Sequence, residues 1–228
     1  MKIGLLIIAT NNYINFLSNL IKSADQYFLK NNDVSYFIFT NKDISFLASN
    51  RKIIKIDVEH KPWPWMTLGR YKIFYENSHE LKNMDYLYYC DVDMKFVADI
   101  GDEIMANLVA TKHPGFYNVN KRGTPETNPK SLAYVSPDEE MEYFAGGFNG
   151  GKKDFFLKMS EKISKNIDVD YKNGIIAIWH DESHMNRYFI DNKPTKILPP
   201  SYCYPESWSL PFDKILLALD KNHKEIRT

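Results

Sequence analysis

The first half of the chain alternates short apolar runs with segments of helical periodicity. Four runs are typical of buried strands and lie at residues 2–9, 34–39, 51–58 and 86–90. Between the first two, apolar residues recur every three or four positions from Ile14 to Phe28, and residues 67–82 show a second helical pattern. This β-α-β order predicts an α/β fold with a parallel sheet, in which residues 1–96 form a nucleotide-binding half.

The second half is less regular. Residues 118–140 are rich in proline and polar residues, which predicts a long loop. Four glycines within residues 146–151 indicate either backbone that approaches another group closely or a tight turn, and residues 153–167 have a helical pattern. The apolar run 175–178 reads as a strand end, followed by a helix that begins near Trp179.

Composition narrows the class of protein. A chain of 228 residues fits one domain, and its 29 basic and 29 acidic residues balance, which argues against a general nucleic-acid or anionic-membrane surface. The cysteines, Cys90 and Cys203, form neither a disulfide framework nor a zinc-ligand cluster. Because no run approaches the roughly 20 apolar residues of a membrane span, we expect a soluble, cytoplasmic protein.

Asp91 and Asp93 form the first candidate site, directly after the strand at residues 86–90. In extended backbone, residues i and i+2 point to the same face, and two adjacent carboxylates are stabilised by a hard cation such as Mg²⁺ or Mn²⁺. The alternative is an acidic pair on a solvated turn. The position at a strand end favours the metal, and a metal with open positions suits a diphosphate, so nucleotide-sugar transfer is the first reaction class to test.

A second polar cluster lies at residues 179–184. Asp181 and Glu182 are either helix N-terminal residues favoured by the helix dipole or catalytic acids, since a carboxylate beneath an anomeric carbon stabilises an oxocarbenium-like state or attacks it. His113, beside a Pro-Gly turn, either binds local backbone or hydrogen-bonds a sugar hydroxyl. Trp179 is suited to stacking on an apolar sugar face.

The C-terminal segment from Lys221 to Arg227 is strongly charged. It is either a solvated end or a tail that folds back over the diphosphate. Two other classes stay open from the residues alone. One is a carbohydrate-binding or nucleotide-sensing protein without turnover, and the other is a nucleotidyltransferase or sugar-nucleotide hydrolase.

Several short strings occur together in an order that is similar to glycosyltransferase family 6, the family of the histo-blood-group A and B transferases and of α-1,3-galactosyltransferase. The resemblance spans nearly the whole chain. The strings are Asp91-Val92-Asp93-Met94, His113-Pro114-Gly115-Phe116-Tyr117, Ala133-Tyr134, Gly146-Gly147-Phe148, Asn173-Gly174-Ile175, Trp179-His180-Asp181-Glu182-Ser183, Lys193-Pro194-Thr195-Lys196 and Lys221-Asn222-His223.

The resemblance implies a single GT-A domain over residues 1–228, with the acceptor half at 97–228. It implies retaining transfer of GalNAc or Gal from the UDP-sugar to a galactose-containing acceptor, with an α-1,3 bond and Mn²⁺ or Mg²⁺ as cofactor. By motif, donor-binding positions are Ile8, Ala9, Thr10 and Tyr13 at the uracil, Trp63 in a sheltering loop, Arg70 at the donor sugar, Asp91 and Asp93 at the metal and the nucleotide with Val92 between them, and Lys221 and Arg227 at the diphosphate.

The same resemblance assigns the second half. Asp181 would contact the donor sugar, Glu182 would be the nucleophile or cation stabiliser and also contact the acceptor, and His113 and Trp179 would bind the acceptor. The segment Tyr143-Phe144-Ala145-Gly146-Gly147, with small residues at Ala145, Gly146 and Gly147, matches the part of the family that selects between GalNAc and Gal. Small residues there leave room for an N-acetyl group, which favours GalNAc.

Three departures from the family pattern bear on these expectations. The membrane anchor and stem of the animal members are not present in this sequence, so a Golgi location is not expected. Many bacterial relatives carry asparagines where this chain has Asp91 and Asp93, so we predict metal dependence. Residues 121–130 differ from the usual family string, and Glu206 stands near an acceptor-contacting aspartate of the animal enzymes, which leaves the acceptor undefined.

Overall fold

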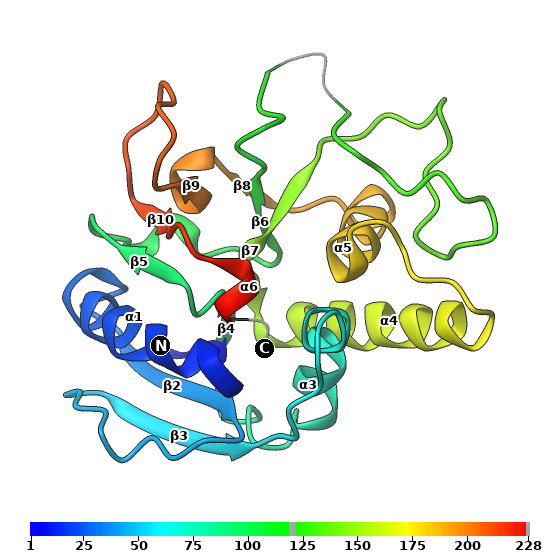
Figure 1. Cartoon of the computed structure of the whole chain (residues 1–228). Helices are drawn as coiled ribbons and strands as arrows, with labels where there is room; N and C mark the ends of the chain where they lie inside the picture. Colours follow the sequence, from blue (N-terminus) through cyan, green and yellow to red (C-terminus); the bar gives the residue numbers. More distant parts are fainter. Residues whose placement is uncertain (119–121, 227–228) are drawn as a thin grey trace.

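The computed structural model describes residues 1–118 and 122–226, and within these residues the strands form one seven-stranded and one three-stranded sheet (Figure 1). The large sheet has the order β3-β2-β1-β4-β7-β6-β8 and the small sheet the order β5-β10-β9. Strands of the large sheet are β1 (Lys2–Ile8), β2 (Asp33–Thr40), β3 (Lys52–Asp57), β4 (Tyr86–Cys90), β6 (Val109–Lys112), β7 (Phe144–Lys152) and β8 (Lys196–Leu198). Those of the small sheet are β5 (Met94–Phe96), β9 (Tyr204–Pro205) and β10 (Leu216–Ala218).

Helices connect and cover these strands. The α-helices are α1 (Ile14–Tyr27), α2 (Trp65–Leu68), α3 (Arg70–Glu76), α4 (Lys153–Lys172), α5 (His180–Asp191) and α6 (His223–Ile226). Short 3₁₀ turns are η1 (Asn11–Tyr13), η2 (Asp102–Ile104) and η3 (Pro200–Cys203). Within the described residues, no helix is both long enough and apolar enough to cross a lipid bilayer.

Strand order places a crevice between β1 and β4. Strands β3, β2, β1 and β4 run parallel, whereas β7 is antiparallel to both of its neighbours. The chain leaves β1 toward β2 on one side and returns to β4 on the other, so connections diverge at the carboxyl ends of these two strands. Ligands of open α/β sheets bind at such points. The predicted α/β class is confirmed, and strands from both halves of the chain share the large sheet.

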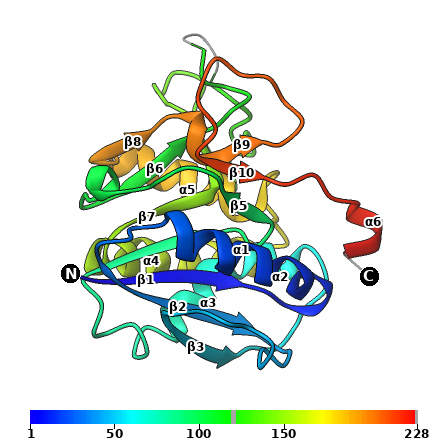
Figure 2. The same cartoon turned by 90° about the vertical axis from the view of Figure 1, so that its left-hand side faces the viewer.

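Two apolar layers hold the sheet between helices. On one face, Leu17 and Leu20 of α1, together with Phe28 directly after it, pack with Ile3 and Leu5 of β1 and with residues of the small sheet. On the other face, side chains of α3, α4 and α5 pack against the sheet in a second cluster. Figure 2 shows α1 over one side of the sheet and α3 and α4 over the other. Successive residues of β1 point to opposite layers, which explains why the whole run is apolar.

The glycine-rich segment at residues 146–151 is part of strand β7 and not a tight turn. Close approach is the reason for its glycines. A Cβ on Gly150 would lie 2.4 Å from the carbonyl oxygen of Leu87, and one on Gly151, whose φ is +138°, would lie 2.4 Å from that of Asn107. Only glycine tolerates both the contact and the dihedral. The glycines at 146–151 therefore reflect close backbone approach, which was one of the two alternatives.

Two other expectations were wrong. The predicted helix at residues 67–82 is two shorter helices separated at Gly69, and α3 ends at Glu76 because the side chain of Asn77 donates a hydrogen bond to the carbonyl of Ile73. The apolar run at 175–178 is not a strand but a connection between α4 and α5, in which Ile176 and Ile178 are exposed. Residues 179–184 therefore follow a turn and not a strand end.

Candidate active site

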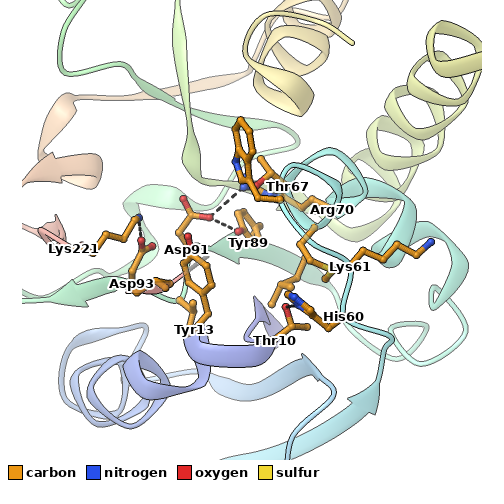
Figure 3. Close-up of a pocket in the computed structure, with 15 residues that line it drawn as sticks. Thr10, Tyr13, His60, Lys61, Thr67, Arg70, Tyr89, Asp91, Asp93 and Lys221 are labelled. Carbon is orange, nitrogen blue, oxygen red and sulfur yellow. Dashed lines mark hydrogen bonds and ion pairs between the residues drawn. The ribbon is translucent and has the colours of Figure 1, made fainter. Parts of the chain in front are cut away.

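A cavity of about 220 Å³ opens at the carboxyl ends of β1 and β4 (Figure 3). It brings together most of the residues predicted to bind the donor. Its lining includes Ile8, Thr10, Tyr13, Trp63, Arg70, Asp91, Val92, Asp93 and Lys221. Ala9 is fully buried beside the cavity and does not line it, and Arg227 lies outside the described residues. Residues from five separate parts of the chain thus meet at the crevice that the strand order predicts.

Asp91 and Asp93 lie on a turn and not on extended backbone. Strand β4 ends at Cys90, and the N–H of Met94 donates to the carbonyl oxygen of Asp91 at 3.2 Å, which closes the turn. The N–H of Asp91 still donates to Gly147 of β7, so the turn begins at a fixed position. The expected extended geometry was wrong, but both carboxylates line the same cavity.

Each of these carboxylates has a different cationic partner (Figure 3). Asp91 Oδ1 lies 3.3 Å from Nη2 of Arg70, while Asp93 forms an ion pair with the Nζ of Lys221. The same Nζ lies 5.9 Å from the centre of the Tyr13 ring. The C-terminal segment therefore folds back to the cavity, and it places its ammonium group at one of the two predicted metal ligands.

Arg70 joins the two acidic segments. Its guanidinium is buried and lies 3.3 Å from Asp91, 3.2 Å from Asp181 Oδ2, and 2.9 Å from the carbonyl oxygen of Gly146, to which Nη1 donates. It also lies 4.3 Å from the centre of the Tyr89 ring. A planar group with several donors is suited to such a junction. Arg70 thus links the predicted metal turn to helix α5 and to strand β7.

Helix α5 presents Asp181 and Glu182 in its first turn. Glu182 Oε2 accepts a hydrogen bond of 2.8 Å from the N–H of Gly146. Burial raises the pKa of Glu182 to about 7, and the Gly146 hydrogen bond opposes this rise. Burial likewise raises the pKa of Asp181 to about 6, against the opposing effect of the Arg70 cation. Perturbed acids of this kind are typical of functional sites.

The turn before α5 is strained and held by hydrogen bonds. His180 has a φ of +54°, which is uncommon for a residue with a side chain. Its N–H donates to Ala177, and the N–H of Trp179 donates to Ser183 Oγ at 3.0 Å. The His180 ring lies 5.1 Å from that of Trp63, so the predicted sheltering loop contacts the turn that carries the acids. Strain of this kind concentrates at functional sites.

The predicted acceptor residues lie outside the cavity lining, on the side of the acids. Trp179 immediately precedes α5 and is 47% exposed, as a stacking surface requires. Nδ1 of His113 accepts the N–H of Gly115 at 3.0 Å, and burial lowers the pKa of His113 to about 4. A neutral imidazole whose Nδ1 accepts carries its hydrogen on Nε2. Both open alternatives for His113 are therefore compatible, because one nitrogen binds backbone and the other is a donor.

The chemistry of the cavity fits a hard divalent cation. Its two carboxylates offer the oxygen donors that Mg²⁺ and Mn²⁺ prefer, and the Lys221 ammonium at Asp93 marks a position where positive charge is favourable. Within the described residues, no three His, Cys, Asp or Glu side chains are grouped so that they could hold a metal by themselves. An ion bound here would take its remaining ligands from water and from a phosphate-bearing substrate.

Sequence reasoning gave no site role to several residues that line the cavity or contact its acids. The Tyr89 hydroxyl donates to Asp91, and His60 Nδ1 lies 3.0 Å from Thr10 Oγ1 at the other end of the cavity. Tyr143 hydrogen-bonds the Glu182 carboxylate. Tyr89 precedes Asp91 by two positions at a strand end, which was a usable signal. Nothing in the local pattern marks His60, because its partner is distant in sequence, and the segment that begins at Tyr143 was matched to donor selection without any indication of the contact with Glu182.

Comparisons with known proteins agree with this geometry. The family model described as "Glycosyltransferase family 6" matches residues 1–228. The chain is 35% identical over 237 residues to histo-blood group ABO system transferase 1 of Rattus norvegicus, covering 99% of this chain and 68% of that protein. It is 31% identical over 240 residues to globoside alpha-1,3-N-acetylgalactosaminyltransferase 1 of Gallus gallus, covering 100% and 69%.

A bacterial relative has nearly the same length. The chain is 27% identical over 227 residues to the O-antigen biosynthesis glycosyltransferase WbnI of Escherichia coli, and the match covers 98% of this chain and 97% of that protein. The mixed sheet and its crevice agree with a GT-A-type fold. From the full-length family match and these relatives, we conclude that the chain belongs to glycosyltransferase family 6 and is a glycosyltransferase that uses a nucleotide-sugar donor and a glycan acceptor.

Proposed function

We propose that this protein transfers GalNAc, or Gal, from the UDP-sugar to the 3-hydroxyl of a β-galactoside with retention of configuration, forming an α-1,3 bond. The bond between the anomeric carbon and the diphosphate breaks, the bond to the acceptor oxygen forms, and UDP and the hydroxyl proton are released. Asp91 and Asp93 would hold Mn²⁺ or Mg²⁺. When bound, this ion would stabilise the negative charge of the departing diphosphate.

The Arg70 junction is the observation that carries the proposal. It joins Asp91, at the predicted diphosphate end, to Asp181 and to the Gly146 carbonyl, while the Gly146 N–H holds Glu182. A donor whose diphosphate lies at Asp91 therefore has its sugar beside these acids. That is where a carboxylate must lie in order to stabilise or attack an anomeric centre.

The protein residues have separate tasks in this proposal. Thr10 and Tyr13 lie where the nucleoside would bind, and Trp63 lines the same cavity from the loop that contacts His180. Lys221 would move from Asp93 to the diphosphate when the donor binds. Glu182 must be ionised to act on the developing cation, so its elevated pKa places the onset of activity near neutral pH.

Donor choice rests on strand β7. Ala145, Gly146 and Gly147 present no side chain beyond a methyl group beside Arg70 and Glu182. A Cβ on Gly146 would lie in van der Waals contact with Arg70 Nη1 and Glu182 Oε2, both at 3.4 Å, and a Cβ on Gly147 would lie 3.1 Å from Asp91 Oδ2, so a larger side chain at either position would fill the space beside these groups. We infer that this strand leaves room for the N-acetyl group and that UDP-GalNAc is the preferred donor.

A donor and acceptor screen read by mass spectrometry tests the proposal. The protein is incubated with UDP-GalNAc or UDP-Gal, Mn²⁺, and plain or fucosylated β-galactosides, with EDTA as the metal-free arm. A disaccharide-extended product is expected only with metal. Free sugar alone would identify a sugar-nucleotide hydrolase, and donor binding without any product would identify a binding protein. Either result would contradict the proposal.

Two variants test the metal site within this assay. Asp93→Asn removes one of the two predicted ligands, so we expect metal-stimulated turnover to fall about 100-fold or more. Asp99→Asn changes an exposed carboxylate whose salt bridge to Lys30 lies at the surface, and it serves as the matched control. If both variants kept the metal response of the wild type, the assignment of Asp93 would be wrong.

A further inference from the structure

We infer that Glu126 is a positioning residue for catalysis, which acts by holding the turn that presents Trp179 and Glu182. The inference rests on the proposed function. Glu126 lies in the long loop at residues 118–140, far from the cavity lining, and is 7% exposed. Its Oε2 accepts a hydrogen bond of 2.7 Å from the N–H of Ile178, across 52 residues of sequence. Ile178 directly precedes Trp179.

The loop holds Glu126 in place. Its carbonyl oxygen accepts the N–H of Val135 at 3.0 Å, and its Oε1 accepts the N–H of Asn128 at 2.8 Å. Farther along the loop, Asp170 at the end of α4 accepts hydrogen bonds from the Ser131 hydroxyl and the Leu132 N–H, at 2.6 and 2.9 Å. The Glu126 carboxylate is therefore held in place as a hydrogen-bond acceptor, because its loop is bound to the end of α4.

The turn requires such an acceptor. Residues 175–179 are neither helix nor strand, Ile178 is exposed, and His180 adopts a left-handed backbone conformation. Such a conformation persists only where surrounding contacts determine it. Ser183 binds the N–H of Trp179 from within α5, but Glu126 is the buried side chain that fixes the turn from outside the helix.

Loss of this contact should lower the rate of the transfer step and leave the affinity for the donor unchanged. The positions of Trp179 and Glu182 both depend on this turn, because the N–H of Glu182 donates to the carbonyl oxygen of Trp179 at 3.0 Å. A displacement of about 1 Å at reacting groups lowers rates by up to about 100-fold. The cavity that Thr10 and Tyr13 line includes no side chain from residues 122–140, the described part of the loop around Glu126.

The test compares three variants in the chain of 228 residues. Glu126→Ala deletes the acceptor, and Glu126→Asp keeps the charge but withdraws it by about 1.5 Å. Glu139→Ala is the control, because Glu139 ties the same loop to α5 through Arg187 at 2.6 Å without contacting the turn. We measure kcat and KM for transfer, the Kd for UDP with Mn²⁺, and amide hydrogen exchange of the peptide covering residues 177–183.

We expect both Glu126 variants to exchange faster in that peptide and to lose about 10-fold or more in kcat, with Kd for UDP within about twofold of wild type. Glu139→Ala should match the wild type in the hydrogen exchange of this peptide and in kcat. Unchanged exchange in Glu126→Ala, wild-type kcat in Glu126→Asp, or equal impairment of Glu139→Ala would each overturn the inference. A wild-type protein without transfer would refute the proposed function instead, and the exchange comparison would still decide the positioning role.

Discussion

Replacing Glu182 by glutamine should make the protein more stable and less active at once. The substitution removes a partly buried carboxylate while keeping an oxygen that can accept the N–H of Gly146. If Glu182 attacks or stabilises the anomeric centre, the amide cannot replace it, and transfer should fall by about 1,000-fold or more while UDP binding is spared. The gain in stability should depend on pH in a direction that the pKa of Glu182 determines.

The magnitude follows from the elevated pKa. Burial raises the pKa of Glu182 from 4.5 to about 7. At about 1.4 kcal/mol for each pKa unit, ionising this group costs the folded state about 3 kcal/mol. Because the side chain is only partly buried, water reduces the cost to about 1–2 kcal/mol. For a chain of this size, that corresponds to a rise in melting temperature of about 3–6 °C in Glu182→Gln.

The direction in which the stability gain of Glu182→Gln changes with pH depends on whether the folded or the unfolded state binds the Glu182 proton more tightly. The folded-state pKa lies above the unfolded value, so below about pH 4.5 both states are protonated and the substitution gains nothing. Between about pH 4.5 and pH 7 the unfolded wild type ionises while the folded state keeps its proton, so the wild type loses stability and the advantage of the glutamine variant grows until it is complete above about pH 7. Differential scanning fluorimetry at about pH 5 and about pH 8.5 measures the difference. Glu140→Gln, which changes an exposed carboxylate, is the control.

Three results would refute this reasoning. A Glu182→Gln protein that melts at or below the wild-type temperature at about pH 8.5 would mean that the carboxylate is not penalised by burial. A variant that keeps near-wild-type transfer would mean that Glu182 is not the acting group. Equal stabilisation by Glu140→Gln would show that the effect reflects net charge and not burial.

The remaining predictions concern the tail and the donor pocket. Lys221→Ala removes the ammonium group that pairs with Asp93, so calorimetry should show tighter Mn²⁺ binding without UDP and weaker UDP binding with Mn²⁺. Unchanged affinity in both titrations would contradict the proposal that Lys221 moves from Asp93 to the diphosphate when the donor binds. Ala145→Met fills space on β7, so its kcat/KM for UDP-GalNAc should fall about 10-fold or more relative to UDP-Gal. An unaltered ratio of the two donors would exclude this strand from donor selection.

Sequence pattern predicted the fold best where apolar runs are buried on both faces. Strand β4 was predicted with the boundaries it has, because residues 86–90 contact both apolar layers and no polar position interrupts them. The run at 175–178 has a similar composition, but it lies on the surface between two helices. Periodicity does not distinguish these cases, because burial is decided by elements that are distant in sequence. Strand β7 was missed for the same reason, since its glycines are explained only by its neighbours.

Within the site, the motifs located the acids but not their connections. The Asp91 turn and the start of α5 were both identified as candidate chemistry. Their link through Arg70, and the two contacts of the Gly146 peptide, depend on the pairing of β7 with β4, which no local pattern encodes. Roles assigned by motif to Asp93, Glu182 and His113 stay predictions until substitution tests them.

One peptide unit of β7 takes part in two properties that enzyme engineers usually treat as separate. The N–H of Gly146 donates to the Glu182 carboxylate and its carbonyl accepts from Arg70, and we propose that its lack of a side chain leaves room for the sugar substituent. Any redesign that narrows or tilts this strand to favour another donor will also alter the acidity of Glu182. Selectivity and pH optimum should therefore evolve together in this enzyme.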